Sequence, residues 1–170
     1  MHGLEKGVVL VVAYDPNWPA QYALEAARLH ELIGALILDI QHVGSTAVPG
    51  CDAKPIIDIA VSISEEGKVA ECVPLLAGLG YTYKGENGIP GRHYFQRGLP
   101  ACLFHLHMST PEHPNWIHML RFRDHLRRHP ETLQAYCQLK QDLAARYPNN
   151  REAYTEGKAS FIQSILKEQL

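Results

Sequence analysis

Apolar and polar positions in the first third of the chain predict strands separated by one helix. Residues 8–14 are β-branched and apolar and are followed by a proline, which predicts a first strand and a turn. Residues 19–34 carry apolar side chains at helical spacing and end at a glycine, which predicts a helix. Residues 36–43 and 55–63 predict two neighbouring strands. The glycine- and proline-containing residues 44–54 are expected to form a polar loop between them, outside the core.

The rest of the chain predicts short strands followed by helices. Residues 65–79 predict a helix that Pro74 is expected to kink or divide in two, because proline lacks the amide hydrogen that helical bonding needs. Glycine turns separate the next apolar runs, and prolines suit the first turns of the later helices. These patterns predict strands at residues 81–84, 92–97 and 101–109, and helices at residues 114–129, 130–147 and 151–170.

Length and composition favour one compact unit. The 170 residues, 46% hydrophobic and 20% charged, exclude wholesale disorder and predict a single domain over residues 1–170. The longest apolar stretches are far too short to span a membrane, and the N-terminus lacks the regions of a signal peptide. We therefore expect no membrane association and a cytoplasmic location. The sequence leaves the oligomeric state open.

Charge and cysteine content narrow the chemistry further. The formal net charge of −2 gives no strong nucleic-acid signal, so any recognition of phosphate must be local. The four cysteines lie far apart, without a Cys-x-x-Cys pair. We expect them to be reduced and mostly buried, at Cys51, Cys72, Cys102 and Cys137.

Several blocks of sequence resemble the GrpB family, a branch of the nucleotidyltransferase-fold superfamily. The segment HVGSTAVPG at residues 42–50, followed by KPIIDI at residues 54–59, is similar to the family signature. The resemblance implies an α+β fold: a nucleotidyltransferase-like mixed β-sheet flanked by helices, with a helical C-terminal part. Further similar blocks are YDPNWP at residues 14–19, FHLH at 104–107, LRFRDHLR at 120–127 and YTEGK at 154–158.

The superfamily places a Gly-Ser pair at the end of one strand and a metal-binding carboxylate on the next, which Gly44-Ser45 and Asp58 resemble. Glycine lets the backbone approach a phosphate, and main-chain amides and hydroxyl groups hold its oxygens. A nearby carboxylate carries the divalent cation. The alternative is an ordinary glycine turn with Asp58 at a strand surface. The resemblance favours a phosphate site made of Gly44, Ser45, Thr46 and Lys54.

Active members of the superfamily carry a second acidic residue two positions after the first, where this chain has Ala60. Residues 101–108 offer histidines instead of a third carboxylate. His105 and His107, two positions apart on a predicted strand, project from one face and with Asp58 form a candidate catalytic and metal site. Such a set suits zinc, manganese or nickel better than magnesium. The alternative is a pair of hydrogen-bonded histidines beneath the helices.

A few other polar residues are weaker candidates. Arg92, in a glycine-flanked turn, and Lys158, four residues after a tyrosine, are candidates for anion contacts, with surface pairing as the alternative. His118, His125 and His129 recur at helical intervals, and only His118, near the helix start, is kept as a site candidate. Most of the arginines in the same helix are expected on its solvent face: Arg121, Arg123, Arg127 and Arg128.

Two functions from different classes follow from these features. The first is binding of a small phosphorylated or nucleotide-like ligand in a cleft between the sheet and the C-terminal helices, with a divergent metal-dependent transfer reaction as a further step. The alternative is a non-catalytic ligand-binding or protein-interaction module that has lost the superfamily's carboxylates, as Ala60 suggests.

Overall fold

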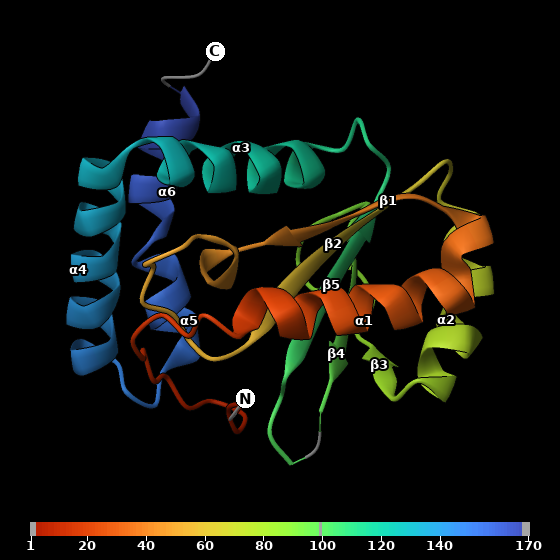
Figure 1. The fold of residues 1–170 in the computed structure, drawn as a ribbon, viewed down its shortest axis with the longest axis horizontal. Coiled ribbons are helices and arrows are strands. Elements are labelled where there is room, and N and C mark those ends of the chain that lie inside the picture. The colour runs from red at the N-terminus through yellow and green to blue at the C-terminus, as the bar shows by residue number, and fades with distance from the viewer. Residues whose placement is uncertain (1–2, 99, 168–170) are drawn as a thin grey trace.

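A five-stranded mixed sheet forms the centre of the computed structural model, which describes residues 3–98 and 100–167 (Figure 1). The strand order is β1-β2-β5-β4-β3. Strands β2 and β5 are parallel neighbours, and the other three pairs are antiparallel. The strands are β1 (Ile37–Val43), β2 (Ile57–Ile63), β3 (Tyr81–Tyr83), β4 (His93–Arg97) and β5 (Phe104–Ser109).

Strand β2 contributes side chains to both faces of the sheet, because successive side chains of a strand point in opposite directions. Ile57, Ile59, Val61 and Ile63 are fully buried in the main core, against α1 (Trp18–Ile33) and α2 (Lys68–Gly78). The intervening residues project to the other face. That second face carries Asp58 and the polar residues described below.

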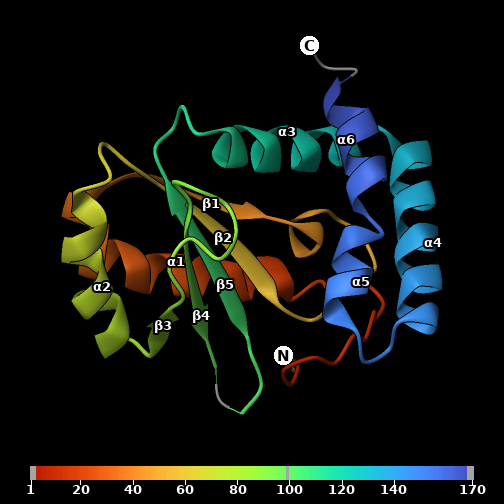
Figure 2. The same ribbon diagram turned by 180° about the vertical axis from the view of Figure 1, so that it is seen from behind.

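Four helices form the C-terminal part of the chain (Figure 2). Helix α3 packs against strands β1, β2 and β5, where Trp116 contacts Val43 and Ala60 in a small apolar cluster. Within the described residues, no helix combines the length and the apolar character needed to cross a bilayer. The mixed sheet, flanking helices and helical C-terminal part confirm the predicted α+β architecture. The four helices are α3 (Pro114–Arg128), α4 (Pro130–Arg146), α5 (Arg151–Glu156) and α6 (Ala159–Lys167).

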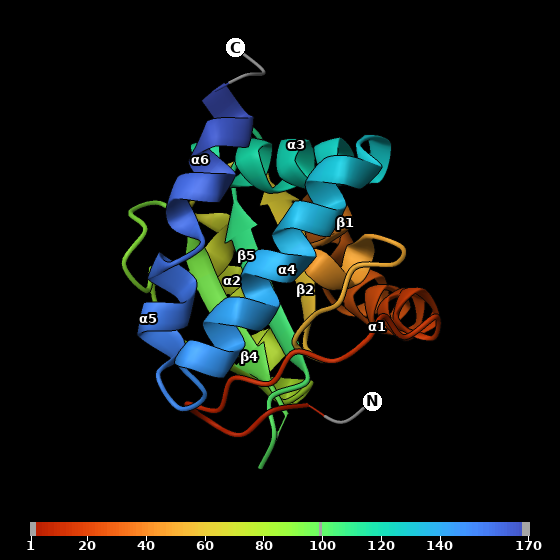
Figure 3. The same ribbon diagram turned by 90° about the vertical axis from the view of Figure 1, so that its left-hand side faces the viewer.

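The strand prediction for residues 8–14 is wrong. This segment is extended but makes a single isolated bridge, between Val12 and Ala53, and joins none of the five strands. It runs past the ends of α4 and α5 (Figure 3), where Val9 is buried with Leu143 and Tyr154. Its apolar residues are therefore explained by packing against helices and not by membership of the sheet.

Two helix predictions also need correction. The helix expected over residues 151–170 is divided into α5 and α6 by a turn at Gly157, and residues 168–170 lie outside the described chain. A Cβ atom on Gly157 would lie 2.5 Å from a methyl group of Leu143, so glycine permits a close approach to α4. Helix α2, in contrast, continues through Pro74 without being divided, and its buried face includes Cys72 and Leu76.

Candidate functional site

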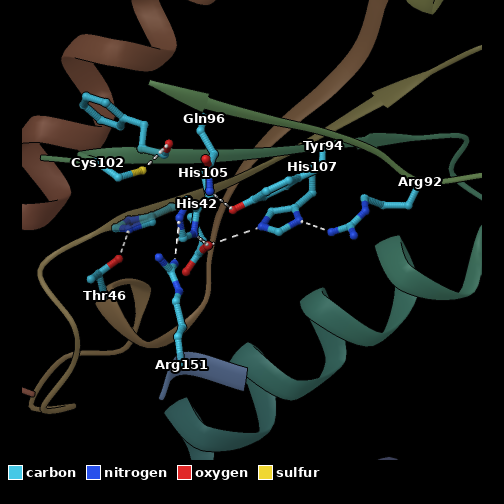
Figure 4. Close-up of polar contacts among 11 residues, drawn as sticks. His42, Thr46, Arg92, Tyr94, Gln96, Cys102, His105, His107 and Arg151 are labelled. Atoms are coloured by element: carbon cyan, nitrogen blue, oxygen red, sulfur yellow. Dashed lines mark hydrogen bonds and ion pairs between the residues drawn. The ribbon is translucent and has the colours of Figure 1, made fainter. Parts of the chain in front are cut away.

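The carboxylate of Asp58 on β2 contacts two histidine side chains of β5. Its Oδ1 atom lies 3.1 Å from His105 Nδ1 and 3.2 Å from His107 Nε2 (Figure 4). The register pairs Asp58 with His105 across the two parallel strands, and alternation sends all three side chains to the same face. The expectation that both imidazoles point together toward Asp58 therefore agrees with the structure.

The outer nitrogen of each imidazole contacts an arginine. Arg151 Nη2 lies 3.0 Å from His105 Nε2, and Arg92 Nη1 lies 3.0 Å from His107 Nδ1. A guanidinium only donates hydrogen bonds, so both of these ring nitrogens act as acceptors. The remaining ring nitrogens then carry the hydrogens and donate them to Asp58. Both imidazoles are thus neutral in this arrangement, held between one carboxylate and two cations.

The charge state of Asp58 follows from its surroundings. Burial alone would raise its pKa, but the hydrogen bonds from His105 and His107 hold that pKa well below the ordinary value. Burial lowers the pKa of His105, against the opposing effect of Asp58. One negative charge therefore sits at the centre of the cluster, with neutral rings around it.

A metal at this cluster requires a different arrangement of the side chains. Among the described residues, no three histidine, cysteine or acidic side chains are arranged to hold an ion. The lone pairs that a metal would need on His105 and His107 accept hydrogen bonds from arginines. The residues as they lie do not fit a transition metal, and a metal here stays a prediction that metal analysis must test.

Gly44 begins the loop that reaches the cluster. Its φ of 71° and ψ of −173° belong to a backbone region that is essentially restricted to glycine. Thr46 Oγ1 lies 2.9 Å from His42 Nε2, beneath the loop (Figure 4). Burial lowers the pKa of His42 to about 4, so this ring is neutral at pH 7. The loop is less exposed than its polar sequence suggests, since several of its residues are buried: Thr46, Ala47, Val48 and Cys51.

Two arginines of α3 contact this loop. Arg123 is half-buried, whereas the others of that helix are exposed, as expected for most of its arginines: Arg121, Arg127 and Arg128. Arg123 Nη1 donates to the carbonyl oxygen of His42 at 2.9 Å. Arg127 donates through Nε and Nη2 to the carbonyl oxygen of Ala47 at 3.0 and 2.7 Å. One of these carbonyl groups lies on the edge strand β1 and the other in the turn that follows it, and the guanidinium groups supply their hydrogen bonds.

Lys140 was missed by the sequence analysis. It lies on α4 and is 1% exposed, with Nζ 3.0 Å from Ser45 Oγ and 3.1 Å from Cys51 Sγ. It also donates to the carbonyl oxygen of Asp52. The available signal was a lysine on the same helix face as Tyr136, four residues earlier, where an apolar residue is expected.

A cleft of about 1010 Å³ opens over the cluster, bordered by the sheet and by α5 and α6. All six predicted phosphate-binding residues and the Asp58 cluster line this cleft. The exposed His118 is not among its lining residues. Asp58 is the single acidic side chain among the described residues that line the cleft. The basic ones are Lys6, Lys54, Lys84, Arg92, Arg151 and Lys158.

Lys54 and Lys158 place two ammonium groups against one aromatic ring. Their Nζ atoms lie 5.3 Å and 4.5 Å from the centre of the Tyr154 ring. Burial, reinforced by repulsion from Arg151, lowers the pKa of Lys54 to about 8. Burial and repulsion from Lys54 lower the pKa of Lys158 to about 7. Within the described chain, neither ammonium has a hydrogen bond or an ion pair, and the charge of Asp58 acts on both without direct contact.

Arg92 and Arg151 differ in how much of each guanidinium is already used. Arg92 is 5% exposed and donates to the carbonyl oxygens of Glu86 and Asn87 as well as to His107. These contacts leave one N–H on Nη1 for a ligand. Arg151 makes a single hydrogen bond among the described residues, to His105. Arg151, which sequence reasoning did not single out, is therefore the better anion contact.

Comparison with known proteins identifies the family of the chain. The family model described as GrpB protein matches residues 8–168, and the chain belongs to that family. UPF0157 protein YqkA of Bacillus subtilis is 37% identical over 163 residues, and the chain spans 48% of YqkA's length. Glutamate-rich protein GrpB of Alkalihalophilus pseudofirmus is 34% identical over 173 residues, 99% of each chain. The crystal structure of conserved protein GrpB from Enterococcus faecalis matches with a TM-score of 0.87 and 36% identity, over 94% of this chain and 96% of that one.

Proposed function

We propose that the chain binds a small phosphorylated or nucleotide-like ligand in the cleft, with its phosphate held by Lys54, Lys158 and Arg151. The observation that carries this proposal is the pair of ammonium groups over Tyr154 that make no ion pair within the described chain. Two cations in a partly desolvated site repel each other, and a bound phosphate removes that penalty. The Ser45 hydroxyl accepts from Lys140 and is also a hydrogen-bond partner of Cys51, and rotation of its O–H would direct that hydrogen to the same phosphate.

The volume of the cleft suits a ligand larger than phosphate alone. Small-molecule sites in proteins measure about 300–1,000 Å³, and this cleft is about 1010 Å³. Its lining includes the apolar side chains of Phe122, Tyr136 and Ile162 beside the basic residues. A ligand with a charged phosphate end and a less polar body, such as a nucleotide, matches both parts of this surface.

Binding without turnover is the better supported form of this proposal. Transfer through two metals needs several carboxylates, and Ala60, in the second position, is fully buried in an apolar cluster with Trp116. Among the described residues lining the cleft, Asp58 alone is acidic, and its Oδ1 is engaged by both imidazoles. One carboxylate in this setting does not hold a pair of cations.

A catalytic role is the second candidate, and one observation favours it. A carboxylate that orients a neutral imidazole is the arrangement of a general base, and Asp58 orients two. A phosphate that draws Arg151 away from His105 would free a ring lone pair to accept a proton. A divergent phosphoryl-transfer or hydrolytic reaction would then use His105 as the base. If a divalent cation were bound, Asp58 would be the residue to hold it, and the cation would supply neutralisation of the phosphate charge.

Thermal-shift and calorimetric titrations test the binding proposal. Inorganic pyrophosphate and adenosine diphosphate are expected to raise the melting temperature, whereas adenosine is not, because a ligand that prefers the native state stabilises it. Ser45→Ala should weaken pyrophosphate binding by about tenfold or more, from an expected loss of roughly 1.5–3 kcal/mol. Ser160→Ala, an exposed position on α6, is the control. Equal responses to adenosine and its diphosphate would refute a phosphate site.

A further inference from the structure

Cys51 and Cys137 form a close pair of thiols beneath the phosphate loop. Their Sγ atoms lie 3.7 Å apart, and the Cys137 thiol is placed to donate to Cys51. Cys51 is fully buried in the connection between β1 and β2, and Cys137 is half-buried on α4. The connection runs toward α4, so residues distant in the sequence meet here (Figure 1, Figure 3).

Lys140 gives this pair an unusual electrostatic setting. Its buried ammonium contacts Ser45 Oγ, Cys51 Sγ and the carbonyl oxygen of Asp52. Of these three groups, only the sulfur of Cys51 can carry a negative charge, and Lys140 makes no ion pair with a carboxylate in the described chain. A buried ammonium requires a counter-charge. The thiolate form of Cys51 supplies it.

The groups around Cys51 determine the pKa of its thiol. The hydrogen bond from the Cys137 thiol and the contacts of Lys140 and Ser45, against the opposing effect of burial, together lower the pKa of Cys51 to about 6. The other ionisable groups near Cys51 are Tyr136 and Tyr154, both neutral because their own pKa values are raised by burial. One thiolate and one thiol in contact are the two components that a disulfide needs.

We propose that Cys51 and Cys137 are a reversible redox site, in which a peroxide converts the thiolate and thiol into an intramolecular disulfide. The Cys51 thiolate attacks one peroxide oxygen, so an S–O bond forms, the O–O bond breaks and hydroxide leaves. That hydroxide takes the Cys137 proton and becomes water. The Cys137 sulfur then displaces the second hydroxide from Cys51, which solvent protonates. Two electrons pass from the sulfurs to the peroxide, and a dithiol reductant reverses the step.

The local backbone permits this change. A disulfide needs sulfur atoms about 2.05 Å apart, so the present separation of 3.7 Å must shorten. Cys137 is fixed within a 17-residue helix, whereas Cys51 lies in irregular chain between the 3-10 turn at Ser45–Ala47 and β2. Movement of the loop toward the helix brings the sulfurs together without breaking a helix or the sheet.

Oxidation of the cysteine pair is expected to change the proposed ligand site, because Lys140 contacts both. The disulfide removes the thiolate, which leaves the buried ammonium without its negative partner, and the same Nζ holds the hydroxyl of Ser45. The loop that carries Ser45 is therefore expected to shift on oxidation. This consequence for ligand affinity rests on the proposed phosphate site, whereas formation of the disulfide does not.

Peptide mapping under non-reducing conditions tests the redox site. The full chain is treated with hydrogen peroxide after removal of reductant, and free thiols are then blocked with iodoacetamide. We expect the peptides containing Cys51 and Cys137 to be recovered as one linked species, two hydrogen masses lighter than their sum and separated by dithiothreitol. Cys72, buried away from the pair, and Cys102 serve as internal controls and should stay alkylated thiols.

Two variants test which cysteines form the disulfide. Cys137→Ser should abolish the linked species and leave Cys51 trapped as its sulfenic acid, whereas Cys102→Ser should leave the disulfide unchanged. Oxidation of Cys72 or Cys102 in preference to the pair would overturn the proposal, as would persistence of two free thiols under peroxide. Pyrophosphate titration of the reduced and oxidised forms separates the two proposals. If the reduced protein does not bind pyrophosphate, the proposed function fails while a disulfide recovered by mapping still stands.

Discussion

Gly44 lies directly against the carboxylate of Asp58. A Cβ atom on residue 44 would be 2.5 Å from Asp58 Oδ2, a distance that real side chains do not tolerate. The glycine at the end of β1 is therefore required by the carboxylate on the next strand, whatever ligand binds above them. The Gly-Ser pair and Asp58, which the sequence links only through a family resemblance, form one packed unit.

Substitution of this glycine should disturb the cluster. Gly44→Ala is expected to lower the melting temperature more than Gly50→Ala, because Gly50 also has a positive φ but no atom within 4 Å of an added Cβ. The ring resonances of His105 and His107 in NMR spectra should shift in Gly44→Ala and not in Gly50→Ala. Equal destabilisation with unchanged histidine signals would mean that the contact with Asp58 carries no constraint.

Replacement of Asp58 separates direct anion binding from binding through a metal. Asp58→Asn removes the negative charge at the centre of the cluster, so pyrophosphate affinity measured in the presence of a chelator is expected to rise several-fold. Loss of hydrogen bonds to a charged group should cost roughly 1.5–3 kcal/mol of unfolding free energy, measurable by urea denaturation. A variant that folds and binds pyrophosphate more weakly, with the loss confined to samples containing a divalent cation, would support a metal bridge instead.

The two half-buried lysines of the cleft, Lys54 and Lys158, predict a rise in stability with pH. The pKa of Lys158 is about 7 and that of Lys54 about 8, whereas an unfolded lysine titrates near 10.4. From about pH 7 to 10 the unfolded chain therefore binds more protons than the folded chain, and these lysines destabilise the fold less as pH rises. Urea denaturation from pH 6.5 to 9.5 should show a smaller rise for Lys158→Met than for the unmodified protein. Parallel pH profiles would contradict the lowered pKa of Lys158.

Arg151 should control the titration of His105. Burial is the main reason for the lowered pKa of His105, and the positive charge of Arg151 lowers it further. Arg151→Gln is therefore expected to raise that pKa in an NMR titration and also to weaken pyrophosphate binding. Arg146→Gln, at an exposed position on α4, is the matched control and should change neither. A His105 pKa that is the same in Arg151→Gln and Arg146→Gln would show that Arg151 does not influence the titration of His105.

Local sequence patterns predicted the five strands of the sheet and part of the site. Alternation along residues 104–109 correctly places His105 and His107 on the side opposite Leu106 and Met108, which are fully buried in the main core. The same kind of pattern failed for residues 8–14, because an apolar, β-branched run can pack against helices as well as in a sheet. Periodicity reports which side chains are buried, not what covers them.

The site residues that could not be predicted from the sequence contact partners that are far away along the chain. Arg151 meets His105 across 46 positions, and Lys140 meets Ser45 across 95. No local spacing encodes such pairs, and each residue alone resembles an ordinary helical cation. A lysine on the apolar face of α4 was the one usable signal, because a buried ammonium requires polar partners. The family resemblance therefore identified the loop at residues 44–54, but not the distant residues whose side chains contact it.

Isothermal titration with pyrophosphate decides whether the unpaired lysines of the cleft bind a phosphorylated ligand. Lys158→Met should weaken binding by roughly 10- to 150-fold, the equivalent of about 1.5–3 kcal/mol for a charged contact. Lys167→Met makes the same chemical change at an exposed position of α6 that does not line the cleft, and it should bind like the unmodified protein. Equal affinities for the two variants, or no pyrophosphate binding by the unmodified protein, would rule out a phosphate site at these lysines.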